Sequence, residues 1–147
     1  IDSSLLVSDT SMSISVEGKI VSSGKSTVVA SKKVPDVRAI YYKYNGRNIK
    51  WVSNHEKIIL TQILNILKND IELKIELVGF ASAEGTDMYN QKLSEDRAMS
   101  VMNYMIEGGV NQSRMKSKGF GEHFPVGDNK TPGGRSKNRR VEFHFYY

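Results

Sequence analysis

The sequence has no cysteine, three prolines and a single tryptophan among its 147 residues. Without cysteine the chain forms no disulfide and no thiolate zinc site, although cysteine-free proteins occur in every redox compartment. No run approaches the roughly 18 apolar residues that a membrane-spanning helix needs. Because 39% of the residues are hydrophobic and 25% are charged, the chain can bury one core, and we expect one folded domain with an appendage.

The start of the chain and its charge say little about location or partner. The first residue is Ile1 rather than a methionine, which is typical of a processed or truncated fragment and leaves open a targeting segment that has been cut away. The formal net charge of +5 does not choose between nucleic acid, a cell-wall polymer and neither. The densest basic cluster, KTPGGRSKNRR at residues 130–140, lacks interleaved aromatic residues. We therefore expect no nucleic-acid partner.

Residues 1–36 are expected to form a β-rich extension. The segment MSISV at 12–16 alternates apolar and polar residues, STVVASKKV at 26–34 favours β-structure, and SSGK lies between the two. Pro35 interrupts this region, and the next segment, VRAIYYKYNGRNI, reads as a strand that runs into a polar loop. We therefore place the main domain at residues 37–147.

Hydrophobic spacing predicts a helix and a strand in the first half of this domain. Ser53 and Glu56 have the spacing of a helix capping box. A helical run of apolar residues follows them: Ile59, Leu60, Ile63, Leu64 and Leu67. The segment IELKIELVG, which starts at Ile71, alternates apolar and charged residues and predicts a strand with one solvated face that ends at Gly79.

The second half supplies the remaining elements. A helix is predicted from about Asp87 to the Gly108 and Gly109 pair, where glycine can take a left-handed cap. A short strand near 114–118, a glycine-rich loop with one helical turn, and a closing strand RVEFHFYY follow. The order β-α-β-α-β-(α)-β predicts an α+β domain.

The helix that begins near Asp87 carries an arginine on its core-facing side. At about 100° per residue, its inward stripe is apolar in the second half, with Ala98, Val101, Met102 and Met105. In the first half the stripe is polar, with Asn90, Ser94 and Arg97. The loop at 80–86 lies beside the helix N-terminus, which favours an anion, and the Arg97 side chain leans back toward it. Arg97 either grips a carboxylate there with its planar fork, or it ties off loop carbonyls or pairs with a buried acid.

The histidines, Ser94 and the methionines of this helix indicate neither a metal site nor a catalytic site. His55, His123 and His144 show no metal-ligand spacing, and Ser94 has no histidine base within reach in the sequence. The methionines of the helix, including Met99, are typical of packing. We expect no catalytic residue, no metal and no cofactor.

Four segments, taken in order, resemble a known family: IELVGFASAEG, YNQKLSEDRAMSVMNYM, GFGEHFPV and NKTPGGRSKNRRVEF. This order resembles the OmpA-like C-terminal domain, which is also found in MotB and in peptidoglycan-associated lipoprotein. The resemblance runs from about residue 37 to the C-terminus and implies a mixed sheet with helices packed on it. It also implies a non-catalytic periplasmic module of an outer-membrane-attached protein, which binds the diaminopimelate of peptidoglycan stem peptides.

The resemblance also assigns a ligand pocket. It implies that Arg97 takes the ligand carboxylate, with Asn90 as its companion on the helix. Of the two arginines in the NRRVE segment it favours Arg139, because strand alternation sends Arg140 to the opposite face. Asn48 matches a polar position of the first loop as well. The residues expected to bind ligand are Asn45, Phe80, Ala81, Ser82, Asn90, Arg97 and Arg139.

Two departures from the family pattern bear on this pocket. The family loop usually carries an aspartate beside the ligand's ammonium, where this chain has Ser82, and a second acidic position is Lys43. Both changes favour a carboxylate and disfavour an ammonium, so restoring the charge by Ser82→Asp is expected to strengthen diaminopimelate binding. Glu84 replaces the missing charge if the loop brings it into the pocket. The alternatives are a structural or protein-interaction domain that has lost peptidoglycan affinity, and a hydrolase, against which the lack of a catalytic constellation argues.

Overall fold

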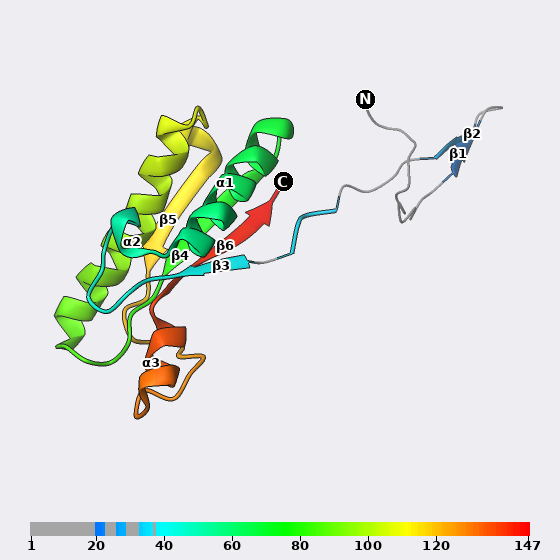
Figure 1. Cartoon of the computed structure of the whole chain (residues 1–147). Helices are drawn as coiled ribbons and strands as arrows, with labels where there is room; N and C mark the ends of the chain where they lie inside the picture. The colour runs from blue at the N-terminus through cyan, green and yellow to red at the C-terminus, as the bar shows by residue number, and fades with distance from the viewer. Residues whose placement is uncertain (1–19, 23–25, 29–32, 37) are drawn as a thin grey trace. The chain divides into compact units, whose positions relative to one another are not determined.

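The computed structural model describes residues 20–22, 26–28, 33–36 and 38–147 (Figure 1). Its contacts divide the chain into two units, Ile1–Lys33 and Val34–Tyr147. In the first unit, β1 (Ile20–Ser22) pairs antiparallel with β2 (Ser26–Val28). The expected strand at 12–16 lies outside the described residues, whereas β2 begins at the first residue of the expected STVVASKKV strand. The assignment of 1–36 and 37–147 as separate domains stays a prediction.

The second unit contains a mixed sheet of four strands. They are β3 (Arg38–Tyr41), β4 (Lys74–Gly79), β5 (Met115–Gly119) and β6 (Arg140–Tyr146). The strand order is β3-β6-β4-β5, in which β4 and β5 are parallel and β6 is antiparallel to both of its neighbours. A parallel pair needs a crossover connection, and here a helix supplies it.

Three α-helices accompany the sheet: α1 (Asn54–Asn69), α2 (Asp87–Glu107) and α3 (Pro132–Asn138). The Ser53 hydroxyl caps α1 by accepting from the Glu56 amide, as the capping box predicts. The crossover helix α2 is capped by Thr86 and ends at Gly108, followed by Gly109 with φ of 107°. Short 3₁₀ turns, η1 (Ile49–Trp51) and η2 (Gln112–Arg114), precede α1 and β5. The predicted element order and α+β class are confirmed.

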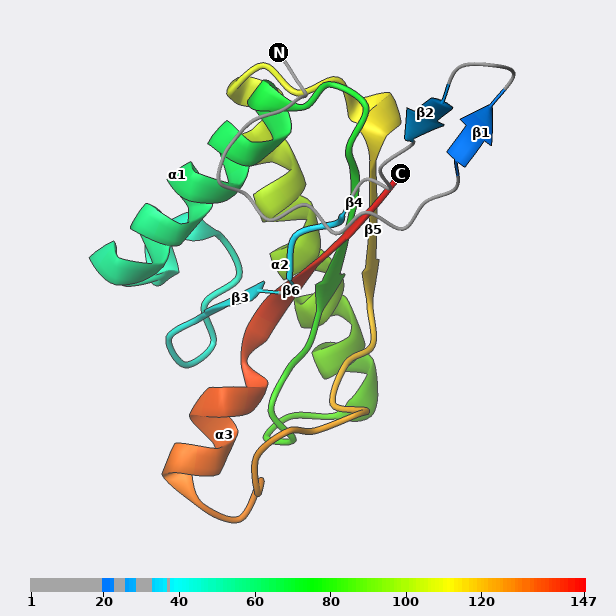
Figure 2. The same ribbon diagram turned by 90° about the vertical axis from the view of Figure 1, so that its right-hand side faces the viewer.

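The core lies between one face of the sheet and the helices α1 and α2, which cover the same face (Figure 2). The α2 stripe is buried as predicted, with Ala98, Val101, Met102 and Met105. Of the predicted α1 stripe, Leu60, Ile63 and Leu67 are buried, whereas Ile59 and Leu64 are partly buried and pack against the core. Alternate residues of the strands meet them: Ile40, Ile75, Leu77, Val141, Phe143 and Phe145. Met99 lies beside this stripe and is 42% exposed.

The first residues of the IELKIELVG segment differ from the prediction. The strand β4 begins at Lys74, and Ile71 is 77% exposed. The reason is a turn at the end of α1, where the Asp70 carbonyl accepts from the Leu73 amide and the Asp70 carboxylate accepts from the Glu72 amide. The apolar–polar alternation that predicted an earlier start of the strand therefore begins at Ile71, which lies in the turn. Leu73, the next apolar residue of the pattern, is buried in the core although it precedes the strand.

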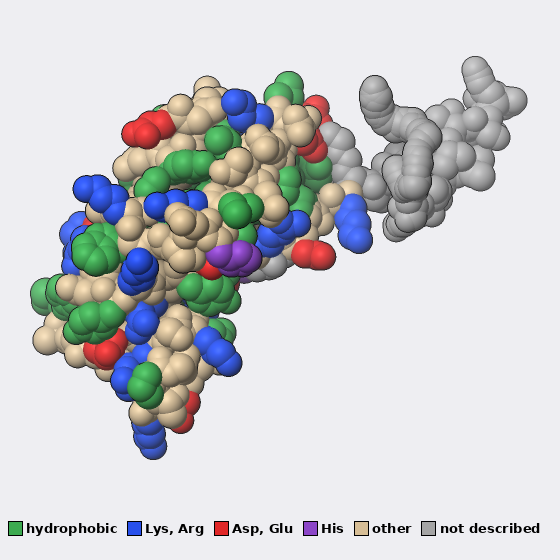
Figure 3. Space-filling model, viewed as in Figure 1, with side chains coloured by type: hydrophobic (Ala, Val, Ile, Leu, Met, Phe, Trp, Pro, Cys, Tyr) green, Lys and Arg blue, Asp and Glu red, His purple; other side chains and the backbone are tan. Residues whose placement is uncertain are grey.

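Charge is spread over the surface of the second unit. Figure 3 shows Lys and Arg side chains distributed over one face, interspersed with hydrophobic and acidic side chains. Among the described residues, no helix is both long and apolar enough to span a membrane. The absence of a nucleic-acid partner stays a prediction.

Candidate functional site

The polar half of the α2 stripe is buried as deeply as the apolar half. Asn90 is 2% exposed, and Ser94 and Arg97 have no exposed surface. The Ser94 hydroxyl donates to the Gln91 carbonyl and accepts from the Gly121 amide, both at 2.8 Å. A Cβ on Gly79 would lie 2.0 Å from the Ser94 carbonyl oxygen. The backbone of Ser94 therefore packs closely against the end of β4, and its hydroxyl is already engaged in holding the loop at Gly121.

Arg97 reaches across to two loops. Its Nε donates to the Gly46 carbonyl at 2.6 Å and its Nη1 donates to the Phe80 carbonyl at 3.0 Å. Its third nitrogen, Nη2, is buried without a hydrogen-bond partner, and no other buried side-chain nitrogen or oxygen of the described residues shares this condition. Burial disfavours the charged guanidinium and lowers the Arg97 pKa to about 10, so the side chain remains charged at neutral pH.

Arg97 thus donates hydrogen bonds to loop carbonyls, as the alternative interpretation expected, and its Nη2 donor remains unpaired. Leaving a buried donor unpaired costs free energy, so such a group is a candidate for binding an acceptor. Arg97 lines a pocket of about 180 Å³, which is large compared with the roughly 10 to 15 Å³ of cavity volume that one water molecule needs. The pocket can therefore hold a small polar group such as the head of an amino acid.

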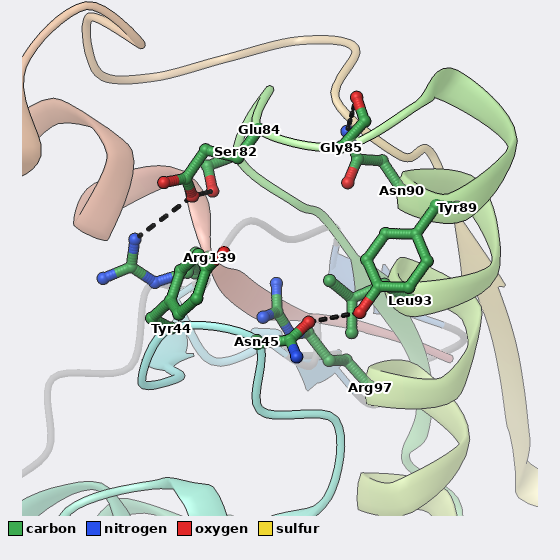
Figure 4. Close-up of a pocket in the computed structure, with 10 residues that line it drawn as sticks. All are labelled: Tyr44, Asn45, Ser82, Glu84, Gly85, Tyr89, Asn90, Leu93, Arg97 and Arg139. Atoms are coloured by element: carbon green, nitrogen blue, oxygen red, sulfur yellow. Dashed lines mark hydrogen bonds and ion pairs between the residues drawn. The ribbon is translucent and has the colours of Figure 1, made fainter.

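The pocket lies between the loop after β3, the loop after β4 and the first turns of α2 (Figure 4). Arg139, the residue just before β6, completes the wall. The lining residues are Tyr44, Asn45, Ser82, Glu84, Gly85, Tyr89, Asn90, Leu93, Arg97 and Arg139.

The loop after β4 does bring Glu84 into the pocket. The Ser82 hydroxyl donates to Glu84 Oε1 at 2.6 Å, and Arg135 of α3 pairs with Oε2 at 3.2 Å. Arg139 Nη1 lies 3.9 Å from the same carboxylate. The pocket therefore contains a fixed carboxylate in addition to the guanidinium of Arg97, although Ser82 has replaced the aspartate that the family pattern carries.

Two asparagines line the pocket as expected. Asn90 Nδ2 donates to Glu122 Oε1 at 2.8 Å and lies 3.4 Å from the Gly85 carbonyl. Asn45, in the left-handed region with φ of 58°, accepts a hydrogen bond from the Tyr89 hydroxyl. This contact joins the first loop to α2 across the pocket.

The structure separates the two arginines of the NRRVE segment. Arg139 lines the pocket and its Nε donates to the Tyr42 carbonyl at 3.1 Å. The Arg140 guanidinium lies 3.7 Å from the centre of the Phe80 ring and pairs with Glu142 at 2.7 Å. Arg140, Phe80 and Glu142 line a different groove. Arg139 therefore lines the pocket beside Arg97, and Arg140 lines the groove beside Phe80.

Phe80 and Ala81 were expected in the pocket but do not line it. The Phe80 ring turns away from it and packs against Phe120, so that Phe80 contributes only the carbonyl that Arg97 holds. The Ala81 amide donates to the Gly121 carbonyl at 2.7 Å, and its side chain is buried. In this loop Ser82, rather than Phe80 or Ala81, faces the pocket. Likewise, Asn48 caps η1, and Lys43 is exposed and absent from the lining.

Four lining residues were missed by the sequence analysis: Tyr44, Gly85, Tyr89 and Leu93. Leu93 lies three residues after Asn90 on the same side of α2, so helical spacing could have indicated it. Tyr44 and Gly85 depend on the path of two loops, for which the sequence has no comparable signal.

The described residues contain no group of three His, Cys, Asp or Glu side chains that could hold a metal. His144 contacts Glu142 at 2.8 Å and His123 lies 3.5 Å from Asp87. No histidine lines the pocket. Its charged groups are the guanidiniums of Arg97, which has a free donor, and Arg139, and the fixed carboxylate of Glu84. Charges of both signs suit recognition of a ligand that carries both a carboxylate and an ammonium.

Comparisons with known proteins agree with this fold. The sequence is 41% identical over 97 residues to the outer-membrane lipoprotein YfiB of Pseudomonas aeruginosa, an alignment that covers 65% of this chain and 57% of YfiB. It is 34% identical over 84 residues to the peptidoglycan-binding protein ArfA of Mycobacterium bovis, covering 57% of this chain and 26% of ArfA. The chain therefore spans about half of one relative and a quarter of the other.

The crystal structure of the peptidoglycan-associated lipoprotein from Burkholderia pseudomallei has the same fold. It superposes with a TM-score of 0.68 at 24% identity, over 74% of this chain and 90% of that protein. The sequence profile of the OmpA family matches residues 41–139, which include every residue that lines the pocket. This chain belongs to the OmpA family.

Proposed function

We propose that this chain is a non-catalytic binding module that anchors an envelope protein to the cell wall. The observation that carries the proposal is the buried Arg97, whose Nη2 has no partner and whose guanidinium lines a pocket of amino-acid size. One relative is named as a peptidoglycan-binding protein, which supports the same class of ligand. A catalytic role has no support in the pocket, because the three hydroxyl-bearing side chains that line it, Tyr44, Ser82 and Tyr89, lack a histidine base there.

The ligand we propose is the diaminopimelate residue of the peptidoglycan stem peptide. Its free end carries a carboxylate and an ammonium on one carbon. The carboxylate accepts from Arg97 Nη2, and the ammonium lies near Glu84 and Asn90. Arg97 is the main anchor, because a charge-assisted hydrogen bond in a site shielded from water is stronger than one in solvent.

The place of action we propose is the periplasm, in a protein attached to the outer membrane. The support is the similarity to YfiB, which is named an outer-membrane lipoprotein, and to the lipoprotein from B. pseudomallei. Peptidoglycan is accessible from this compartment, so location and ligand agree.

The alternative function is a structural or protein-interaction domain that no longer binds peptidoglycan. It was suggested by Ser82 and Lys43, but Lys43 does not line the pocket, and Glu84 supplies a carboxylate beside Ser82. Calorimetric titration of the whole chain with diaminopimelate separates the two functions. Saturable binding supports the anchor, and heats equal to buffer dilution support the alternative.

A further inference from the structure

Glu122 lies outside the pocket lining but contacts Asn90, which is part of that lining. The Asn90 amide nitrogen donates to Glu122 Oε1 at 2.8 Å, and the Gly85 carbonyl lies 3.4 Å away on the same side. An ionised carboxylate and a carbonyl are both acceptors, so the amide cannot turn around without placing its oxygen against other oxygens. The Asn90 Oδ1 is therefore held on the other side, where Figure 4 shows it turned toward the pocket residues.

The two glycines of the GFGEHFPV segment allow the loop to place Glu122 beside the Asn90 amide. A Cβ on Gly119 would lie 2.3 Å from the Ser94 hydroxyl, so only glycine permits this approach to α2. Gly121 has φ of 62°, which favours glycine, and its amide donates to the Ser94 hydroxyl. Ser94 lies one helical turn after Asn90, so a loop fixed at Ser94 sets Glu122 beside the Asn90 amide.

We propose that Glu122 is a positioning residue, which fixes the Asn90 amide so that its oxygen accepts a hydrogen bond from an ammonium group of the ligand. This proposal rests on the proposed function and assigns the source of its selectivity. Arg97 offers a donor from one side of the pocket, whereas Asn90 and Glu84 offer acceptors (Figure 4). Without Glu122 only the more distant Gly85 carbonyl, 3.4 Å away, opposes a turn of the amide that would bring its NH₂ toward the pocket, where a donor would face an ammonium.

The consequence is a preference for ligands that carry ammonium groups. Diaminopimelate and pimelate share one carbon chain and both carboxylates, and pimelate lacks the amino groups. Each can use Arg97, but only diaminopimelate can use the Asn90 oxygen. The ratio of the two affinities therefore reports on the orientation of the Asn90 amide, and a general loss of pocket structure would lower both affinities together.

The test is to titrate the whole chain and two variants with both compounds. Glu122→Met keeps the length of the side chain and removes its acceptor, and it should weaken diaminopimelate binding about tenfold without weakening pimelate binding. Glu122→Gln keeps an oxygen that accepts from Asn90, and it should retain the preference within about threefold. Should the methionine variant fail to fold, Glu122→Ala, which introduces no new volume, carries the same comparison.

Three results would overturn the proposal, and each is distinguishable. A folded Glu122→Met protein that keeps the wild-type preference for diaminopimelate shows that the carboxylate does not set the Asn90 amide. An equal loss of affinity for both compounds shows that Glu122 only supports the fold. If the unaltered chain binds neither compound, the proposed function is itself wrong and the positioning role is lost with it.

Discussion

Replacing Arg97 with lysine separates the two tasks of this side chain. Nε and Nη1 hold the Gly46 and Phe80 carbonyls, while Nη2 is left for a ligand. A lysine ammonium carries its donors at a single point, so it can satisfy a loop carbonyl but cannot also present a donor at the place of Nη2. We therefore expect Arg97→Lys to fold and to bind diaminopimelate weakly.

The magnitudes favour lysine over alanine for this test. Arg97→Ala leaves two buried carbonyls without their donor, at about 1 to 3 kcal/mol each, so a loss of about 2 to 6 kcal/mol of unfolding free energy accompanies any loss of binding. Arg97→Lys retains at least one of these contacts and should cost about 1 to 2 kcal/mol of stability. The lost hydrogen bond to the ligand carboxylate is worth about 1.5 to 3 kcal/mol, which corresponds to binding that is about ten- to a hundredfold weaker.

The assay is calorimetric titration with diaminopimelate, beside urea denaturation of the same samples. Arg114→Lys is a matched control, because Arg114 also holds backbone carbonyls, those of Leu67, Asp70 and Leu73, but does not line the pocket. The control should lose stability and keep its affinity. Wild-type affinity in a folded Arg97→Lys protein would refute the role of Arg97 as the anchor.

Three further predictions concern charge. The sequence-based expectation that Ser82→Asp strengthens diaminopimelate binding is reversed by the structure, because the Ser82 hydroxyl donates to Glu84 at 2.6 Å and a carboxylate there would meet a like charge. We expect about 1 to 2 kcal/mol less stability and no gain in diaminopimelate affinity, and a clear gain in titration would contradict this. Pimelate binding should be constant from about pH 7 to 9 and weaken above the Arg97 pKa of about 10; an affinity unchanged at pH 11 would contradict this. Burial opposes the charge of Glu142, but the hydrogen bonds and charges of Arg140 and His144 together outweigh it and lower the Glu142 pKa below 4.5. The stabilisation by this carboxylate is therefore present above that pH and lost in acid, and Glu142→Gln should flatten the acid limb of a stability curve measured by urea denaturation.

Periodicity predicted the parts of the site that lie on regular elements. The polar stripe of α2 was visible because residues that share an azimuth share an environment, and Asn90, Ser94 and Arg97 are all buried. Arg139 and Arg140 line different surfaces, as strand alternation predicted, but Arg139 is the residue just before β6, so alternation within a strand is not what separates them. The same reasoning was wrong at Ile71, where a turn continues the alternating pattern without continuing the strand.

The loops carried no such signal. Glu84 is positioned by Arg135, which lies far along the chain, and the loop before it is held by Asn129, whose side chain accepts from the Ala83 amide. These contacts depend on tertiary placement of α3 and its preceding loop, so no local pattern at residues 80–86 contains them. For the same reason the sequence did not distinguish the side chain of Ser82, which faces the pocket, from that of Phe80, which does not.

The central claim, that the Arg97 pocket binds the cell wall, is tested most directly by co-sedimentation of the whole chain with purified sacculi that contain diaminopimelate. We predict that the unaltered chain and the Arg114→Lys control sediment with the sacculi and that free diaminopimelate releases them, whereas Arg97→Lys stays in the supernatant. Equal sedimentation of Arg97→Lys and the unaltered chain, or no sedimentation of either, would contradict the account.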